Sequence, residues 1–205
     1  MTPLSDCRLL TPADVEPAAD IIAQAFVNDP LISFILPVKS ARMNTLKTFF
    51  RIYGEINILN GRGYGVGEPL QGVAYWQPPG SESLSISIKA LAKLLPLVFT
   101  AYPFGYIRAR AIFRTTDSLH QKYAADPHYY LDNLGVLPSA QGKGWSSKLM
   151  RPILEQADAQ QVIAYTDTTS PANVGFYAHF GFECVEQAAV PGTGVTVFAL
   201  RRPLF

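Results

Sequence analysis

The sequence is poor in charge. Charged residues make up 16 % of its 205 residues, and 17 Lys and Arg against 16 Asp and Glu leave a net charge of +1. Such a balance offers neither the basic surface that binds nucleic acid nor an acidic tail, so we expect no nucleic-acid partner. The apolar fraction of 48 % instead indicates a well-buried globular core.

Cysteine is scarce as well. The two cysteines, Cys7 and Cys184, are far apart in the sequence, and the three histidines show no spacing typical of metal ligands. A disulfide framework and a zinc site are therefore disfavoured, and we expect no metal. The first residues also lack the basic start and apolar run of a signal peptide. Together these absences predict a reduced, cytoplasmic protein.

Long hydrophobic runs are missing too. Residues 94–107 come nearest, but this uncharged segment is shorter than the roughly 18 residues that a membrane-spanning helix needs. Pro96 and Pro103 also interrupt it. We therefore expect buried or cavity-lining helices here and no membrane partner.

Periodicity predicts a single α+β domain over residues 1–205. Helical spacing of apolar residues predicts helices over 12–27 and 41–60, and alternating glycines at 61–67 favour a strand and a turn. Residues 77–127 are expected to form a helical insertion, broken at Pro96, Pro103 and near Thr115. The remaining expected elements are strands over 7–10, 72–76, 128–137, 162–168, 183–190 and 193–202 and helices over 144–160 and 170–182.

The stretch QGKGWSS, residues 141–147, looks suited to phosphate. It is no P-loop, because Leu137 stands where the first glycine is required and Gly144 follows Lys143. It is no dinucleotide fingerprint, because Ser147 replaces the third glycine. A strand runs into the loop and a helix follows it, an arrangement that can bind a pyrophosphate. On these residues alone, a plain glycine turn into a helix is equally well supported.

Two motifs carry a family resemblance. Residues 134–150, LGVLPSAQGKGWSSKLM, resemble the acetyl-CoA loop of the GNAT acyltransferases, Q/R-x-x-G-x-G/A, with Ser146 in the last small position. Residues 170–182 resemble the family's second motif, N-x-x-x-Y-x-[K/R/H]-x-G-F, through Asn173, Tyr177, His179, Gly181 and Phe182. The resemblance covers 128–200 well and 7–76 loosely. It implies the GNAT fold, a mixed, mostly antiparallel twisted sheet of six to seven strands flanked by helices, with a helical insertion between strands 3 and 4.

The resemblance also implies a function. An acetyl group would move from acetyl-CoA, as co-substrate, to a primary amine of a small molecule by direct attack in a ternary complex. The backbone of residues 134–136 would pair with the pantetheine arm, and an N–H there would stabilise the oxyanion. The implied cofactor-binding residues are Leu134, Gly135, Val136, Gln141, Gly142, Lys143, Gly144, Trp145, Ser146, Ser147, Asn173 and Tyr177.

Such a reaction requires an acid and a base. An alkyl amine with a pKa of roughly 10 has to lose a proton, and the departing thiolate has to gain one. Tyr177 aligns with the family's tyrosine near the sulfur and is the expected acid; the alternative is an ordinary core tyrosine. Asp132 is the expected base, with Tyr130 as the fallback, because strand alternation predicts that Tyr130, Asp132, Leu134 and Val136 share one face. An Asp that only holds a backbone N–H is the alternative.

The amine pocket is expected to involve Phe26, Asp29, Trp76 and Tyr130. Aromatic residues of the insertion could line it too, or form the core of a helical lid; they are Phe99, Tyr102, Phe104, Tyr106 and Phe113. A competing function is a GNAT-fold module that binds acyl-CoA as a sensor or structural partner without turnover. Tyr177 favours the enzyme, because binding alone needs no acid. The sequence leaves a homodimer open.

Overall fold

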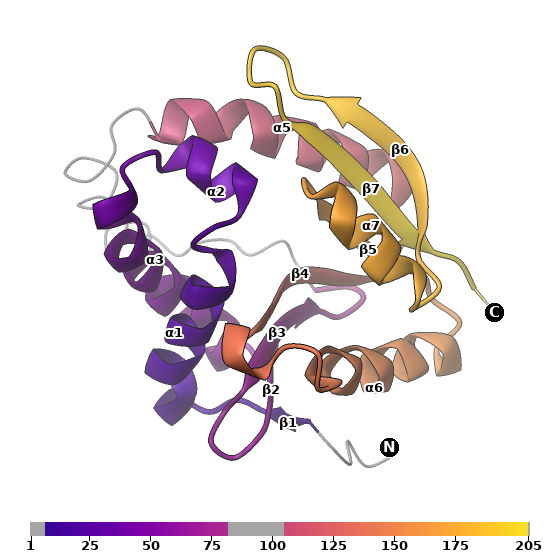
Figure 1. The fold of residues 1–205 in the computed structure, drawn as a ribbon. Coiled ribbons are helices and arrows are strands. Elements are labelled where there is room, and N and C mark those ends of the chain that lie inside the picture. Colours follow the sequence, from indigo (N-terminus) through magenta and orange to yellow (C-terminus); the bar gives the residue numbers. More distant parts are fainter. Residues whose placement is uncertain (1–6, 82–104, 205) are drawn as a thin grey trace.

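A seven-stranded sheet forms the centre of the computed structural model, which describes residues 7–81 and 105–204 (Figure 1). The strand order is β1-β2-β3-β4-β5-β7-β6. β4 and β5 run parallel, and the other neighbouring pairs run antiparallel. The strands are β1 (Arg8–Leu9), β2 (Gly63–Val66), β3 (Gly72–Gln77), β4 (Tyr129–Val136), β5 (Ala164–Thr168), β6 (Glu183–Ala189) and β7 (Thr196–Arg202). The predicted mixed, mostly antiparallel sheet is confirmed.

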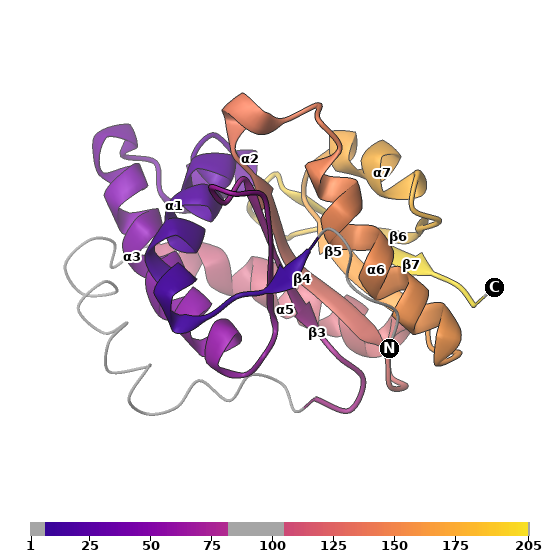
Figure 2. The same cartoon turned by 90° about the horizontal axis from the view of Figure 1, so that it is seen from below.

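Helices cover both faces of this sheet. Figure 2 shows α1 and α3 on one side of the strands and α6 and α7 on the other. α5 packs against β5 and β7 on the face of α1 and α3, through Ile112 and Leu119. The helices are η1 (Pro12–Asp14), α1 (Val15–Phe26), α2 (Pro30–Ile35), α3 (Lys39–Leu59), α5 (Gly105–Tyr123), η3 (Pro138–Ala140), α6 (Trp145–Ala159) and α7 (Pro171–Ala178).

The short helix α2 was not predicted. The sequence NDP does end α1, but it also starts the next helix. The Asp29 carboxylate accepts hydrogen bonds from the N–H groups of Leu31 (2.8 Å) and Ile32 (3.2 Å), and Pro30 takes the first helical position. These are the features of a helix start, because they satisfy N–H groups that have no partner within the helix.

Within the predicted insertion, α5 runs without interruption through Thr115, where a break was expected. The Thr115 hydroxyl donates to the carbonyl of Ala111 at 3.0 Å, so its polar group is satisfied inside the helix. The predicted breaks at Pro96 and Pro103 lie outside the described residues, as does most of the apolar segment 94–107. In the described parts of the chain, no helix has the length and apolar character to cross a membrane.

The parallel pair β4 and β5 separates after two residues. Tyr129 pairs with Ala164 and Tyr130 with Tyr165, while β4 stays paired with β3 as far as Val136. At the fork, the Thr166 hydroxyl donates to the Leu131 carbonyl at 2.8 Å. A wedge-shaped gap therefore opens between the two strands beyond this point.

A β-bulge lies on β4 beside the gap. Trp76 of β3 opposes Leu131 and Tyr75 opposes Asn133, which leaves Asp132 as an extra residue. The prediction that residues 130, 132, 134 and 136 share one face is therefore wrong. Tyr130 packs on the α5 side, whereas Leu134 packs with the α6 and α7 core.

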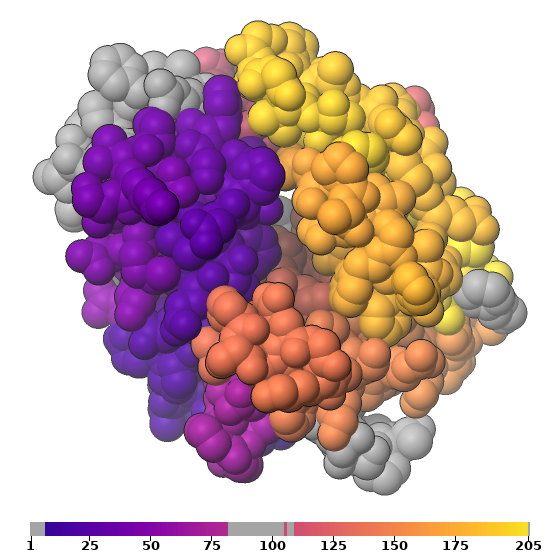
Figure 3. All heavy atoms as spheres, viewed as in Figure 1, coloured from indigo at the N-terminus to yellow at the C-terminus, as the bar shows by residue number. Residues whose placement is uncertain are grey.

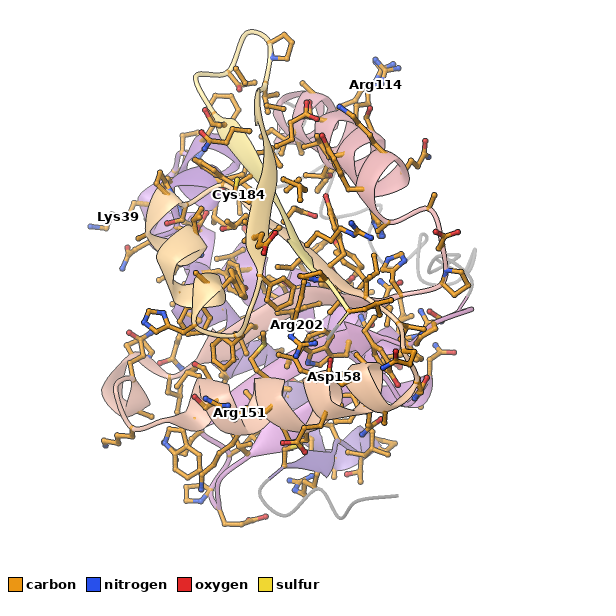
Figure 4. The ribbon with its side chains drawn as sticks, turned by 90° about the vertical axis from the view of Figure 1, so that its right-hand side faces the viewer. Lys39, Arg114, Arg151, Asp158, Cys184 and Arg202 are labelled. Atoms are coloured by element: carbon orange, nitrogen blue, oxygen red, sulfur yellow. The ribbon has the colours of Figure 1, made fainter. Side chains whose placement is uncertain are left out.

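Arg202, at the end of β7, connects the two helices of the second face (Figure 4). Its guanidinium donates to both carboxylate oxygens of Asp158 on α6, at 2.5 and 2.8 Å. It also donates to the carbonyl of Phe180, just after α7, at 3.0 Å. Arg202 is buried, so these contacts fix α6 and α7 to the same strand end.

We predict that Arg202→Ala destabilises the fold by about 2 kcal/mol, because it leaves Asp158 without its partner but still accessible to water. A domain of this size should then lose about 4–8 °C in thermal unfolding. Arg201→Ala, at the exposed neighbouring position, is the control and should unfold within a degree or two of the wild type. Equal effects of the two substitutions would show that the Asp158 contact contributes nothing.

Candidate functional site

A cavity of about 690 Å³ lies between α1, α2 and α3 on one side and α5 on the other. Its floor is the gap between β4 and β5, and it extends through that gap to α7. In the space-filling view the surface is hollowed between the indigo N-terminal helices, the coral loop before α6 and the amber α7 (Figure 3). The volume is that of a small-molecule site.

Aromatic rings form the wall on the α1 and α3 side. Phe26 contacts Phe50 with ring centroids 5.9 Å apart, and Phe49 stacks on Tyr53 at 5.7 Å. On the opposite side α5 contributes Phe113, which is half exposed. Of the other insertion aromatics, Phe99, Tyr102 and Phe104 lie outside the described residues, as does the side chain of Tyr106.

Asp132 lies on the floor of the cavity. The bulge turns its carboxylate toward α3, where the Tyr53 hydroxyl donates a hydrogen bond to it. Burial, and secondarily the nearby Asp167, raises the pKa of Asp132 to about 7, while a hydrogen bond from Asn133 opposes the shift. A carboxyl group with this pKa accepts a proton near neutral pH, as a general base has to.

Asp167, on β5, faces the same cavity across the gap. The Tyr130 hydroxyl crosses the gap and donates to its carboxylate at 3.2 Å. Burial raises the pKa of Asp167 to about 6, partly opposed by this hydrogen bond, and the charge of Asp117 raises it further. Burial also raises the pKa of Tyr130, so its hydroxyl keeps its proton and donates to Asp167.

Tyr177, on α7, approaches the gap from the other face of the sheet. Its ring is buried against Phe176 and Phe182 and still lines the cavity. Burial, followed by the charge of Asp167, raises the pKa of its hydroxyl, and a hydrogen bond with Thr166 works in the opposite direction. Tyr177 is therefore a core residue that also lines the cavity, so the two alternatives offered by the sequence do not exclude each other.

The glycine loop leads directly into α6. Gly142 and Gly144 have φ angles of 75° and 78°, in the left-handed region that favours glycine, although a side chain would meet only open space. No side chain caps the first turn of α6, so the N–H groups of Trp145, Ser146 and Ser147 remain available to an anion. Such a turn is suited to a phosphate group.

The polar side chains of the loop contact backbone carbonyls. Gln141 donates to Val136 at 3.4 Å and Lys143 to Ser139 at 3.2 Å. Gln141 thereby holds the loop against the end of β4. Lys143 points back to its own loop and remains exposed.

The backbone of β4 presents hydrogen-bonding groups to the gap. The Leu137 N–H donates to Gln71 on the β3 side, so strand alternation directs the N–H groups of Leu134 and Val136 toward the gap. Gly135 lies where β4 and α1 approach each other closely. A Cβ there would lie 2.8 Å from Ile22 and 3.2 Å from Ala25, so glycine allows α1 to pack closely on β4.

Most of the predicted pocket and reaction residues do come together. Those that line the cavity are Phe26, Asp29, Tyr130, Asp132, Leu134, Asn173 and Tyr177. Asn173 also donates to the Thr168 hydroxyl at 3.1 Å. Trp76 does not line the cavity, so its predicted place in the amine pocket is wrong. Its indole is buried on the α6 face and its N–H donates to Leu149 at 3.3 Å.

Sequence reasoning missed two site residues, Tyr53 and Asp167. Tyr53 lies within the predicted helix over 41–60, where it was given no role in the site, yet its hydroxyl reaches Asp132. Asp167 lies in an otherwise buried strand, two residues after Tyr165. An acidic residue in such a strand was the available signal, because burial of a carboxylate requires a partner or a function.

The chain is similar to known acetyltransferases in sequence and in fold. The model of the acetyltransferase (GNAT) family matches residues 90–182. An uncharacterised N-acetyltransferase of Schizosaccharomyces pombe is 26 % identical over 175 residues, which cover 82 % of this chain and 70 % of that protein.

Two solved structures share the fold. One is described as histone acetyltransferase HPA2 and related acetyltransferase from Corynebacterium glutamicum. It is 20 % identical to this chain and superposes with a TM-score of 0.69, and the match covers 98 % of this chain and 96 % of that chain. Arylalkylamine N-acetyltransferase 2 from Aedes aegypti is 13 % identical with a TM-score of 0.61, covering 97 % and 98 % of the two chains. At these identities the structures show a common fold.

We predict that Asp132→Asn stabilises the protein at pH 8 but changes little at pH 4. The folded state raises the pKa of Asp132 to about 7, above the roughly 4 of an unfolded chain. Its contribution to stability is therefore present below pH 4 and lost as the pH rises through about 7. Thermal unfolding should show the variant several degrees above the wild type at pH 8. A difference independent of pH would contradict the raised pKa.

Proposed function

We propose that this chain, whose residues 90–182 match the model of the acetyltransferase (GNAT) family, is an N-acetyltransferase that moves the acetyl group of acetyl-CoA to a primary amine of a small molecule. The observation that carries the proposal is the single cavity that holds Asp132 at one end of the β4–β5 gap and Tyr177 at the other. A base and an acid then face the same space from opposite sides of the sheet.

The chain offers acetyl-CoA three kinds of contact. The first turn of α6, entered through Gly142 and Gly144, would bind the pyrophosphate with its N–H groups. The N–H and carbonyl groups of Leu134 and Val136 would pair with the pantetheine arm as a neighbouring strand does. Asn173, at the α7 side of the cavity, can donate to the same arm.

The reaction needs one proton removed and one supplied. Acetyl-CoA supplies the acetyl group, the amine nitrogen bonds to its carbonyl carbon, and the carbon–sulfur bond breaks. The proton that leaves nitrogen passes to the Asp132 carboxylate, directly or through a water. The Tyr177 hydroxyl gives its proton to sulfur, so that CoA departs as the thiol, and solvent restores both side chains.

The cavity favours a small acceptor over a polypeptide. Helices enclose it on both sides, and its wall is made of aromatic side chains. The Aedes aegypti structure is named for arylalkylamines, small amines of a kind that such a wall can accommodate. An acyl-CoA sensor without turnover is the alternative; it would need neither the carboxylate at one end of the gap nor the hydroxyl at the other.

We predict that acetyl-CoA and CoA raise the unfolding temperature, whereas ATP and NAD do not. At about 100 times its Kd, a ligand adds roughly 2.7 kcal/mol of stability, which is several degrees for a domain of this size. No shift with acetyl-CoA and CoA, or a shift with ATP or NAD instead, would overturn the assignment of the co-substrate.

Gly144→Val should weaken the affinity for CoA about tenfold, because a branched side chain opposes the left-handed backbone that aims the N–H groups of α6. Gly80→Val is the matched control. Gly80 has a φ angle of 71° and open space around it, but it lies outside the loop and the cavity. Titration calorimetry with CoA measures both variants. Equal affinities would place the pyrophosphate elsewhere.

We predict that Tyr177→Phe lowers kcat about 100-fold and leaves the Kd for acetyl-CoA nearly unchanged, because it removes a proton donor and keeps the ring. Release of free thiol in the presence of an amine measures turnover, and calorimetry measures the Kd. Wild-type turnover in the variant would remove Tyr177 from the mechanism. Binding of acetyl-CoA with no thiol release in the presence of any amine would favour the sensor.

A further inference from the structure

The charged side chains that line the cavity all have one sign. Four aspartates contribute to it: Asp29, Asp117, Asp132 and Asp167. Among the lining residues that the structure describes, none is Lys, Arg or His. In a chain whose charges nearly balance, this concentration of carboxylates makes the cavity selective for cations.

The four carboxylates differ in what they already bind. Asp29 caps α2, and Asp117 is exposed on α5 at the side of the cavity. Asp132 and Asp167 stand on either side of the β4–β5 gap, each with a tyrosine hydroxyl as its hydrogen-bond partner. Each tyrosine occupies one site on a carboxylate that can accept several hydrogen bonds, so both carboxylates can still bind a donor.

An ammonium group is the missing partner of this pair. Burial raises the pKa of both carboxyl groups, and a neighbouring carboxylate raises each further, Asp167 for Asp132 and Asp117 for Asp167. A cation between Asp132 and Asp167 removes the repulsion between these two carboxylates. An anionic group on the same ligand would restore it, since like charges brought together in a recess are strongly unfavourable.

Apolar walls define the rest of the acceptor. Above the two carboxylates, the rings of Phe49 and Tyr53 are stacked, and Phe26 and Phe50 continue the wall toward α1. Such a wall stabilises an aromatic or apolar carbon skeleton and offers nothing that pairs with a carboxylate or a phosphate.

We propose, on the basis of the acetyl transfer proposed above, that Asp167 is a second substrate-binding carboxylate. Together with Asp132 it selects a cationic primary amine on an apolar skeleton and rejects amines that also carry a carboxylate or phosphate. Asp167 binds and positions the ammonium group, which loses one proton to solvent before it attacks, and Asp132 takes the second proton as the amide bond forms. The acceptor is thus an amine without an acid group, and free amino acids are excluded.

The test compares two probes that differ by one group, phenethylamine and phenylalanine. Calorimetry on the protein saturated with CoA measures both affinities without turnover. We expect phenethylamine to bind at least 50-fold more tightly in the wild type. Asp167→Asn keeps a hydrogen-bond acceptor for Tyr130 but removes the charge. It should lower the affinity for phenethylamine at least tenfold and reduce the preference for phenethylamine over phenylalanine by the same factor. Asp167→Glu should retain most of the preference.

Asp20→Asn is the control, because it removes a carboxylate outside the cavity that pairs with Lys47, and it should leave both affinities unchanged. Unfolding curves confirm that each variant is folded; if Asp167→Asn is not, the wild type and Asp167→Glu still decide. Failure of phenethylamine to bind, equal affinities for the two probes, or an unchanged preference in Asp167→Asn would each overturn the inference. Selective binding without amide formation would instead overturn the proposed acetyl transfer and leave the amine site standing.

Discussion

The site depends on the early separation of β4 from β5. Only two residue pairs join these strands, and the Thr166 hydroxyl then bonds to the Leu131 carbonyl where the ladder would otherwise continue. Beyond the fork, the backbone groups of β4 that point away from β3 have no strand partner and can pair with a ligand. The same opening forms the floor of the cavity, so an acceptor held on one face of the sheet and a thioester held in the gap can meet without crossing a strand.

The bulge at Asp132 resolves a conflict within one strand. Leu134 and Val136 are needed to cover the core under α6, whereas a carboxylate cannot be buried there without a partner. Strict alternation would place Asp132 on the same face as those two residues. One extra residue shifts the register, so Asp132 faces Tyr53 and the cavity while the apolar residues keep their core positions. The bulge is therefore part of the site.

The sequence predicted what local patterns encode. Periodicity located most of the helices and strands, and two motifs located the glycine loop and Tyr177. It failed where an outcome depends on how strands pair. The alternating pattern of the sequence does not reveal an extra residue in the strand, so the face predicted for Leu134 was wrong. β3 is buried on both faces, so nothing in it showed that Trp76 points toward α6. Asp167 reaches the site only because β5 lies next to β4, a neighbour distant in sequence.

Burial acts on the proposed acid and the proposed base in the same direction. Removing water disfavours the charged form of any acid, so it raises the pKa of carboxylates and phenols alike. For Asp132 the shift ends near 7, which makes the carboxylate a better base at physiological pH. For Tyr177 the shift keeps the hydroxyl protonated at neutral pH, as the proposed proton donor has to be. Opposite roles thus follow from one environment, because the two groups start on opposite sides of neutral pH.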